Sequence, residues 1–144
     1  MKLTQLSLFL ENKRGAVQVP CRLLADAKVN IRTLCLADSA EYGVLRLIVP
    51  EWQRAKTVLE DAGFAVSVGE VIAIEVPDRP GGLAGLLDLL EQDRLGIVYM
   101  YAFTRGSRAL HAVMIFRFED PDRVIAALAK HHINAISPVE LFAS

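Results

Sequence analysis

The sequence predicts an α+β fold built of two βαββαβ units in tandem, each with an antiparallel sheet covered by helices on one face. Two observations support this prediction. A junction from an alternating apolar run, through a glycine-containing turn, into a helical pattern occurs twice, as LENKRG and as VPDRPGG. A shift of 66 residues, the difference between positions 81 and 15, superimposes four identical pairs: Gly15 with Gly81, Leu23 with Leu89, Leu24 with Leu90 and Ile31 with Ile97. Because the secondary-structure signals then recur in the same order, we interpret the repeat as structural.

The first unit is expected within residues 1–70. In LTQLSLFLE, leucines at every second position predict a strand with one buried face. The turn NKRG follows, and Lys28 with Asn30 ends the helix that we expect after it. That helix is predicted from apolar residues at helical spacing, namely Val17, Cys21, Leu24 and Ala25.

Two strands are expected next, IRTLCLA and VLRLIV, joined by the hairpin connection DSAEYG. Pro50 ends the second strand because proline cannot donate a hydrogen bond to a sheet. EWQRAKTVLEDAG is predicted to form a helix that stops at Gly63, and FAVSV to form the last strand. Only Gly69 and Glu70 separate this strand from the next unit. We therefore expect rigidly related units without a flexible linker.

The second unit is expected within residues 71–144, and it begins with the strand VIAIEV and the turn PDRPGG. Leu83, Leu86, Leu87 and Leu90 then have the spacing of a buried helical stripe. Strands IVYMYAF and LHAVMIFRF flank the turn TRGSR, and the helix DPDRVIAALAKHH and the strand AISPVEL complete the unit. Asp120 is expected to cap that helix, with Pro121 at its first position. This order of elements is that of the ferredoxin-like fold.

Composition narrows the classes of function. The chain has 144 residues, 53% of them hydrophobic, and a formal net charge of −1. Since nucleic-acid affinity comes largely from clustered Lys and Arg, we expect no nucleic-acid partner. We also expect no signal peptide and no membrane span. Cys21 and Cys35 have neither redox-motif nor metal-site spacing, which favours a reduced, cytoplasmic compartment.

The duplicated junction is the candidate binding feature. A helix N-terminus presents unpaired backbone N–H groups and the positive end of the helix dipole, so it accepts an anion. Glycine allows close backbone approach or positive φ, and Asn12 or Asp78 offers a polar group to an ammonium or to the helix. Asn or Asp followed by glycine is also ordinary turn chemistry, so a purely structural role remains open.

These motifs resemble those of tandem ACT-domain proteins, which consist of two ACT units without an enzyme domain. LENKRG with KVNIRTL, and PDRPGGLAGLLDLLEQDRLGI in the second half, are similar to the family's strand, N-R-P-G-type turn, helix and G-x-N-I pattern. LADSAEYGVLRLIV is similar to its second hairpin. The resemblance implies a regulatory fold that binds amino acids or similar small ligands where two ACT units meet.

The resemblance also implies particular binding residues. In the family, the turn after the first strand supplies backbone N–H groups and an Asn, and an Asn before the second strand contributes from the neighbouring unit. In the first unit these positions are Asn12, Arg14, Gly15, Ala16 and Asn30. In the second unit the turn corresponds to Asp78, Pro80, Gly81, Gly82 and Leu83.

Three departures from the family pattern affect these sites. Arg14 stands where proline is usual, and its guanidinium could contact a carboxylate. Gly96 stands where the first unit has Asn30, so the second unit lacks that amide. Pro20 falls a few residues into the first helix, where proline costs about 3 kcal/mol. We expect that helix to start late or to bend.

Three residues outside the turns are further candidates for contact with a ligand. Tyr99, Tyr101 and Phe103 should point to one face of their strand and Met100 to the other. Tyr99 and Tyr101 are therefore further candidates for ligand contact, although core or interface packing is the commoner role of such residues. Arg46 is another, because it lies in an apolar strand where it would pair with Asp38 or a bound carboxylate, or face solvent. No catalytic constellation, metal site or cofactor is predicted, since His111 is isolated and His131 and His132 are adjacent.

The leading hypothesis is a non-enzymatic, cytoplasmic sensor that binds an amino acid or related small carboxylate, forms a homodimer, and acts on its own association or on a partner enzyme. An aromatic or branched ligand is compatible with the tyrosine-rich strand. Two alternatives stay open. One is a structural assembly module that acts without ligand. The other is an acylphosphatase-like hydrolase, because GAVQVPCR, from Gly15 to Arg22, is similar to the phosphate-binding loop of that ferredoxin-like family.

Overall fold

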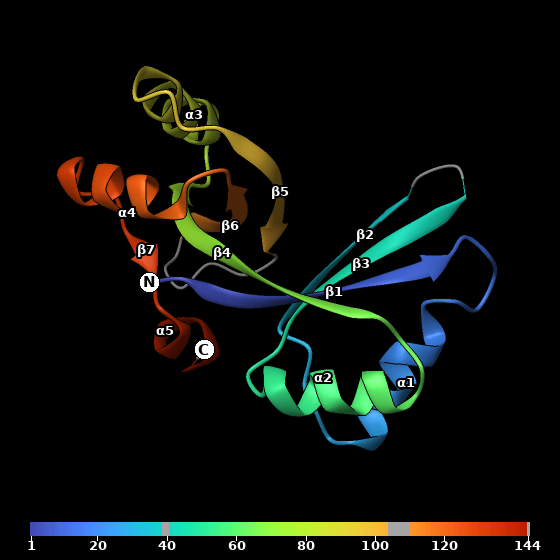
Figure 1. Cartoon of the computed structure of the whole chain (residues 1–144). Helices are drawn as coiled ribbons and strands as arrows, with labels where there is room; N and C mark the ends of the chain where they lie inside the picture. Colours follow the sequence, from blue (N-terminus) through green and yellow to red (C-terminus); the bar gives the residue numbers. More distant parts are fainter. Residues whose placement is uncertain (39–40, 104–109, 144) are drawn as a thin grey trace. The chain divides into compact units, whose positions relative to one another are not determined.

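The computed structural model describes residues 1–38, 41–103 and 110–143, and Figure 1 labels its helices and strands. Thr4–Gly69 form one compact unit, and Glu70–Ser144 form a second together with Met1–Leu3. We propose that the two sequence repeats meet at residue 70, where the division between the compact units also falls. The predicted turn TRGSR and part of DSAEYG lie outside the described residues.

The first unit contains β1 (Leu3–Glu11), α1 (Gln18–Asp26), β2 (Thr33–Asp38), β3 (Tyr42–Ile48) and α2 (Trp52–Asp61), and β4 begins at its end. The strand order is β2-β3-β1-β4. β3 pairs antiparallel with both neighbours, so that Leu8 of β1 and Leu36 of β2 each lie opposite Leu45. Along the chain, the elements follow the βαββαβ order predicted from the sequence.

Leucines of alternate strand positions form the core of the first unit, as the sequence pattern predicts. Leu24 of α1 and Leu59 of α2 pack on this leucine face and are fully buried. The strand residues of the core are Leu6, Leu8, Leu10, Leu45 and Leu47. Since burying one leucine side chain stabilises a protein by about 1.5–3 kcal/mol, the two helices are held to one face of the sheet by this cluster.

The second unit contains the C-terminal part of β4 (Val66–Pro77), α3 (Gly82–Gln92), β5 (Ile97–Phe103), β6 (His111–Phe118), α4 (Pro121–Lys130), β7 (Ala135–Ile136) and α5 (Pro138–Ala143). Its strand order, β7-β4-β6-β5, repeats that of the first unit. Phe116 and Phe118 stack with ring centroids 5.2 Å apart. They share the core with Leu86 and Leu90 of α3 and Val124 of α4.

The N-terminal residues belong to the second unit. Lys2 Nζ lies 3.2 Å from Glu70 Oε2 and 2.8 Å from Asp122 Oδ1. The hydrogen bond that Lys2 donates to Asp122, followed by the one that it donates to Glu70, raises the pKa of the Lys2 amine. These contacts are exposed, so they position the chain end more than they stabilise the fold.

Three predicted strands differ in the structure. FAVSV and VIAIEV are not separate strands, because β4 runs without interruption through Gly69 and Glu70. Neither residue is a proline, so nothing at this point prevents an extended conformation. The strand predicted for AISPVEL ends at Ile136 and is followed by α5.

A capping box explains α5. Ser137 N donates to Glu140 Oε2 at 2.9 Å, and Glu140 N donates to Ser137 Oγ at 3.2 Å. These reciprocal bonds satisfy two donors at the start of a helix, and Pro138 takes the first helical position. The signal is readable in the sequence as SPVE, and it overrides the apolar alternation.

Two local expectations are confirmed. Asp120 caps α4 by accepting from Arg123 N at 3.2 Å. α1 starts late, at Gln18, whereas α3 starts at Gly82, which corresponds to position 16 in the repeat. Pro20 then falls within the first turn of α1, where its missing N–H leaves no helical hydrogen bond unmade.

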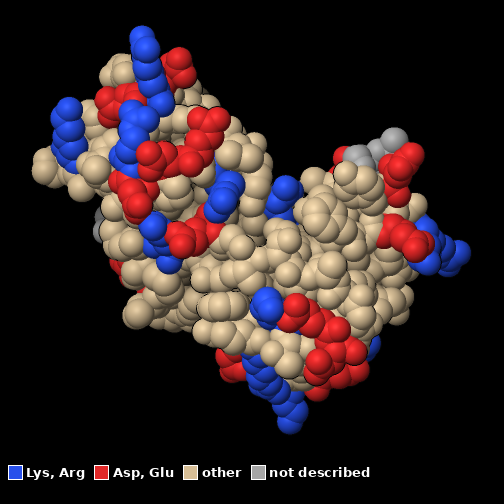
Figure 2. All heavy atoms as spheres, in the orientation of Figure 1, with Lys and Arg blue, Asp and Glu red and all other residues tan. Residues whose placement is uncertain are grey.

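Charged side chains of both signs are interspersed over the face seen in Figure 2. No helix of the described residues combines the length and the apolar character that crossing a lipid bilayer requires.

Four helices, α1 to α4, are each followed by a residue with positive φ, two positions after the last helical residue. These residues are Lys28 (φ 58°), Gly63 (94°), Arg94 (52°) and His132 (55°). The same two backbone hydrogen bonds close the end of each helix. In α3, for example, Arg94 N donates to Glu91 O at 3.0 Å and Leu95 N donates to Leu90 O at 2.9 Å. Only Gly63 adopts this conformation without a steric cost.

We predict that Arg94→Gly stabilises the protein by about 1 kcal/mol, because a left-handed conformation costs a non-glycine residue about that much. Arg94 is exposed, so little packing is lost. Urea unfolding at equilibrium measures the change. Arg94→Ala is the control and should give no gain, since alanine keeps the steric cost; equal stabilisation by both variants would show that the side chain of Arg94, and not its φ, is unfavourable.

Candidate ligand-binding site

The two predicted junctions form the same tight turn. In the second unit, Gly82 N donates to Arg79 O at 3.0 Å, and Gly81 has φ 87° and ψ −8°. These are the angles of the third residue in a type II turn, in which proline, here Pro80, is favoured at the second position. In the first unit, Ala16 N donates to Lys13 O at 3.2 Å and Gly15 has φ 84°. The turn alone therefore explains both glycines.

Gly82 has a separate steric requirement. A Cβ atom on this residue would collide with the carbonyl oxygen of Pro77. The corresponding residue of the first unit is Ala16, where the helix starts two residues later. Gly82 thus permits α3 to begin directly against the end of β4.

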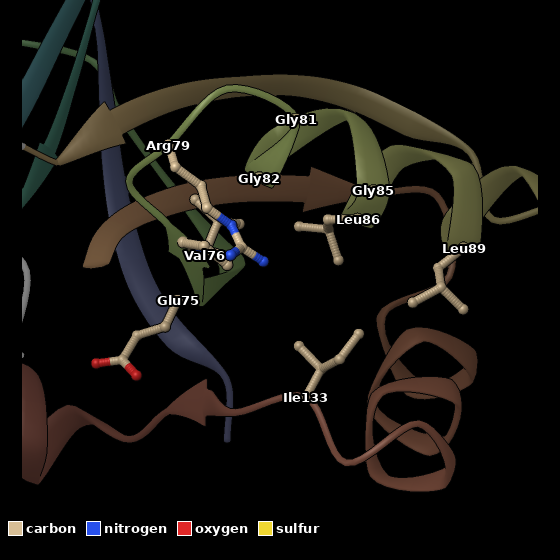
Figure 3. Close-up of a pocket in the computed structure, with 10 residues that line it drawn as sticks. Glu75, Val76, Arg79, Gly81, Gly82, Gly85, Leu86, Leu89 and Ile133 are labelled. Atoms are coloured by element: carbon tan, nitrogen blue, oxygen red, sulfur yellow. The ribbon is translucent and has the colours of Figure 1, made fainter. Parts of the chain in front are cut away.

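A pocket of about 350 Å³ lies beside the second turn (Figure 3). Leu86 and Leu89 of α3 and Ile133, between α4 and β7, present apolar side chains to it. Arg79 extends from the turn with its guanidinium pointing toward this space, whereas the carboxylate of Glu75 points away from the three apolar side chains. The pocket therefore combines apolar walls with a cation at one end.

A second pocket, of about 280 Å³, occupies the equivalent place in the first unit. Six of its residues correspond to residues of the other pocket by the 66-residue shift: Phe9 with Glu75, Leu10 with Val76, Glu11 with Pro77, Lys13 with Arg79, Ala16 with Gly82, and Val19 with Gly85. Phe64 corresponds to Ile133, since each lies two residues before the last strand of its unit. The sequence repeat has thus produced a repeated pocket.

The cations of the two pockets differ in their surroundings. Lys13 Nζ lies 3.0 Å from Glu11 Oε2. The residue equivalent to Glu11 is Pro77, and within residues 1–38, 41–103 and 110–143 no acidic side chain forms an ion pair with Arg79. Arg79 therefore retains its charge for another anion.

The binding residues predicted from the family pattern do not all lie in one place: some form the two turns, and others lie outside the two pockets. The turns hold Arg14, Gly15 and Ala16 in one unit and Pro80, Gly81 and Gly82 in the other. Leu83 is the second residue of α3 and is half-buried against the core of its unit. Asn12 lines a smaller pocket of about 70 Å³ with Leu36 and Asp38. Asp78 N donates to Leu110 O at 2.8 Å, and its side chain does not line the pocket of its unit.

Asn30 does not meet the turn of its own unit. It follows α1, whereas the turn precedes it, and a helix of nine residues is about 13 Å long. At the equivalent Gly96, a Cβ atom would collide with the carboxylate of Glu119. Because Glu119 is exposed and the end of its side chain can move, this contact does not by itself account for the missing amide in the second unit.

Arg46, Tyr99 and Tyr101 lie on sheet faces, away from the two pockets. Arg46 is half-buried between Ser7 and Cys35 in neighbouring strands. Tyr101 lies opposite Ile115, and Met100 lies opposite the core residue Phe116. The predicted alternation along this strand is therefore confirmed.

The acylphosphatase-like interpretation of GAVQVPCR is not supported, because residues 18–22 are helical in α1 and form no phosphate-binding loop. Within the described part of the chain, His, Cys, Asp and Glu form no group suited to a metal ion.

Several pocket residues were missed by the sequence analysis. Lys13, Arg79 and Gly85 were not singled out, and neither were Phe64 and Ile133. The sequence repeat contained a usable signal for Lys13 and Arg79, since the 66-residue shift places one cation on the other. Phe64 and Ile133 could not be paired this way, because the hairpin of the second unit is longer.

Two ferredoxin-like units in tandem, with a pocket beside each strand-to-helix turn, are typical of a class of small regulatory domains. The chain belongs to the ACT domain pair family, whose model matches residues 1–143. ACT domains are generally regulatory modules that bind small ligands, and they commonly bind amino acids and dimerise.

Solved structures agree with this family. A protein from Bacteroides thetaiotaomicron is 34% identical, with a TM-score of 0.90 over 99% of this chain and 96% of that chain. The regulatory subunits of aspartate kinase from Thermus thermophilus, in its ligand-free form, and from Thermus flavus have TM-scores of 0.66 over 90% of either chain. Their identities of 14% and 12% show the fold alone. No curated protein matches the chain.

We predict that Gly82→Ala destabilises the protein by about 1–3 kcal/mol, the usual cost of overpacking. The expected cause is the collision with the Pro77 carbonyl. Gly85→Ala is the matched control in the same helix and should stabilise by about 0.5–1 kcal/mol, because no described heavy atom outside its chain neighbours and its own helix backbone lies within 4 Å of its Cβ position. Urea unfolding measures both changes, and a stabilising Gly82→Ala would contradict the steric account.

Proposed function

We propose that this protein is a non-enzymatic, cytoplasmic regulatory protein that binds an amino acid or a related small carboxylate. It acts as a homodimer, and the ligand is held by the strand-to-helix turns where ACT units meet. The ligand changes the association of the protein or the activity of a partner enzyme. The observation that carries this proposal is the presence of a pocket beside each copy of the turn.

The chemistry of the second turn supports carboxylate binding. The backbone N–H groups of Leu83 and Ala84, in the first turn of α3, have no acceptor among the described residues. They lie at the positive end of the helix dipole, and Arg79 adds a full charge beside them. A carboxylate would pair with both kinds of donor.

The remaining family positions complete the proposed sites. In the first unit the turn would contribute Asn12, Arg14, Gly15 and Ala16, with Asn30 approaching from a neighbouring unit. In the second unit the turn would contribute Asp78, Pro80, Gly81, Gly82 and Leu83. Pro20 removes one N–H group from the first turn of α1, so the first helix offers fewer donors than the second.

Thermal unfolding of the purified protein with each common amino acid and with a panel of 2-oxo, branched and aryl acids tests the proposal. A ligand at 100 times its dissociation constant stabilises the native state by about 2.7 kcal/mol, which is a shift of several degrees in Tm. We expect at least one compound to produce this shift. If none does, the protein is an assembly module that acts without ligand, and the repeated glycines serve the turns alone.

A further inference from the structure

We propose that the pocket of the second unit, and not its counterpart in the first, takes a small branched aliphatic carboxylic acid whose recognition does not require an ammonium group. The apolar tail lies among Leu86, Leu89 and Ile133, and the carboxylate pairs with Arg79. This inference rests on the proposed function, because it names the ligand class and the copy of the site that is used.

The shape of the pocket supports an apolar tail. Val76, Leu86, Leu89 and Ile133 line it from three segments, which are β4, α3 and the connection from α4 to β7. Gly85 contributes no side chain, and apart from its chain neighbours and its own helix backbone no heavy atom of the described residues lies within 4 Å of the position that its Cβ would take. The open space in front of Gly85 is therefore available to a ligand. Compact branched chains fill such a space among branched side chains with many dispersion contacts.

The charges of the pocket define the other end of the ligand. Arg79 points into the space, and its guanidinium suits a carboxylate because both groups are planar and can form two parallel hydrogen bonds. Glu75, the acidic residue of the lining, points its carboxylate away from the apolar residues, and Asn134 Nδ2 donates to Glu75 Oε2 at 3.4 Å. Among the described residues that line this pocket, no acidic group therefore faces a ligand ammonium, which favours a 2-oxo or unsubstituted acid over the corresponding amino acid.

The first unit provides an internal comparison. Val19 replaces Gly85, Ala16 replaces Gly82, and the pocket is smaller, at about 280 Å³ against about 350 Å³. Lys13 replaces Arg79, and its charge is paired with Glu11. Each change reduces either the space for a tail or the charge for a carboxylate. The two pockets have thus diverged, and the second alone has both.

Isothermal titration of the full chain with three probes tests this inference: 4-methyl-2-oxopentanoate, 4-methylpentanoate and leucine. The three share one branched tail and differ in the group next to the carboxylate. We expect the two acids to bind more tightly than leucine, with one site per chain. Leucine binding as tight as that of either acid would overturn the proposed ligand class.

Variants locate the site. Arg79→Gln should weaken binding of the acids about tenfold or more, because a charge-assisted pair is lost. Gly85→Leu, which adds a good helix former that fills the open space, should weaken it to a similar degree. Lys13→Gln is the matched control in the first unit and should leave the affinity within about twofold, as expected for a charge already paired with Glu11. Gly85→Ala shows whether this position tolerates a side chain, since it should raise Tm.

The outcomes separate this inference from the proposed function. If the acids bind but Arg79→Gln and folded Gly85→Leu leave the affinity unchanged, or if Lys13→Gln abolishes binding, the inference is overturned and the regulatory function stands. If only amino acids bind, the ligand class is overturned and the function stands. If no compound of the wider panel binds, both are overturned.

Discussion

The tight turn between the first strand and the first helix of each unit is the constraint on which the rest of the structure depends. A residue with positive φ, Gly15 or Gly81, reverses the chain within four residues and places a helix directly over the strand that precedes it. The leucines of that helix then meet the apolar face of the sheet, and a space remains beside the turn that no side chain of α3 fills. Fold and pocket thus arise from the same backbone reversal.

Duplication of this turn allowed the two units to diverge without loss of the fold. In the first unit, α1 starts later, with Pro20 in its first turn, and Val19 and Phe64 line a smaller pocket. In the second unit, Gly82 lets α3 start against the end of β4, and Gly85 leaves the pocket open. Stability depends on the buried leucines, which occur in both units, whereas binding depends on a few residues at the turn. These residues can change while the core is preserved.

Much of the fold was predictable because each signal was local. Alternating leucines, Gly63 at a helix end, Asp120 as a cap and Pro20 near a helix start all have direct physical consequences for the backbone. The strand predicted over AISPVEL forms only at Ala135–Ile136, because a capping box at Ser137 and Glu140 starts α5 where apolar alternation predicted more strand. The pocket was only partly predictable, since it brings Arg79 and Ile133 together across more than 50 residues of chain. Side-chain direction, which decides that Arg79 points in and Glu75 points away, is a property of tertiary packing.

The central claim is that the pocket of the second unit is a binding site and that its smaller counterpart in the first unit is not. Backbone amide chemical shifts, recorded by two-dimensional NMR while 4-methyl-2-oxopentanoate is added, test it most directly because both turns carry amides that report on their own pocket. The account predicts saturable shifts at Gly81, Gly82 and Gly85, with little change at Gly15 and Ala16. Saturable shifts at Gly15 and Ala16 without shifts at Gly81 and Gly82 would contradict it.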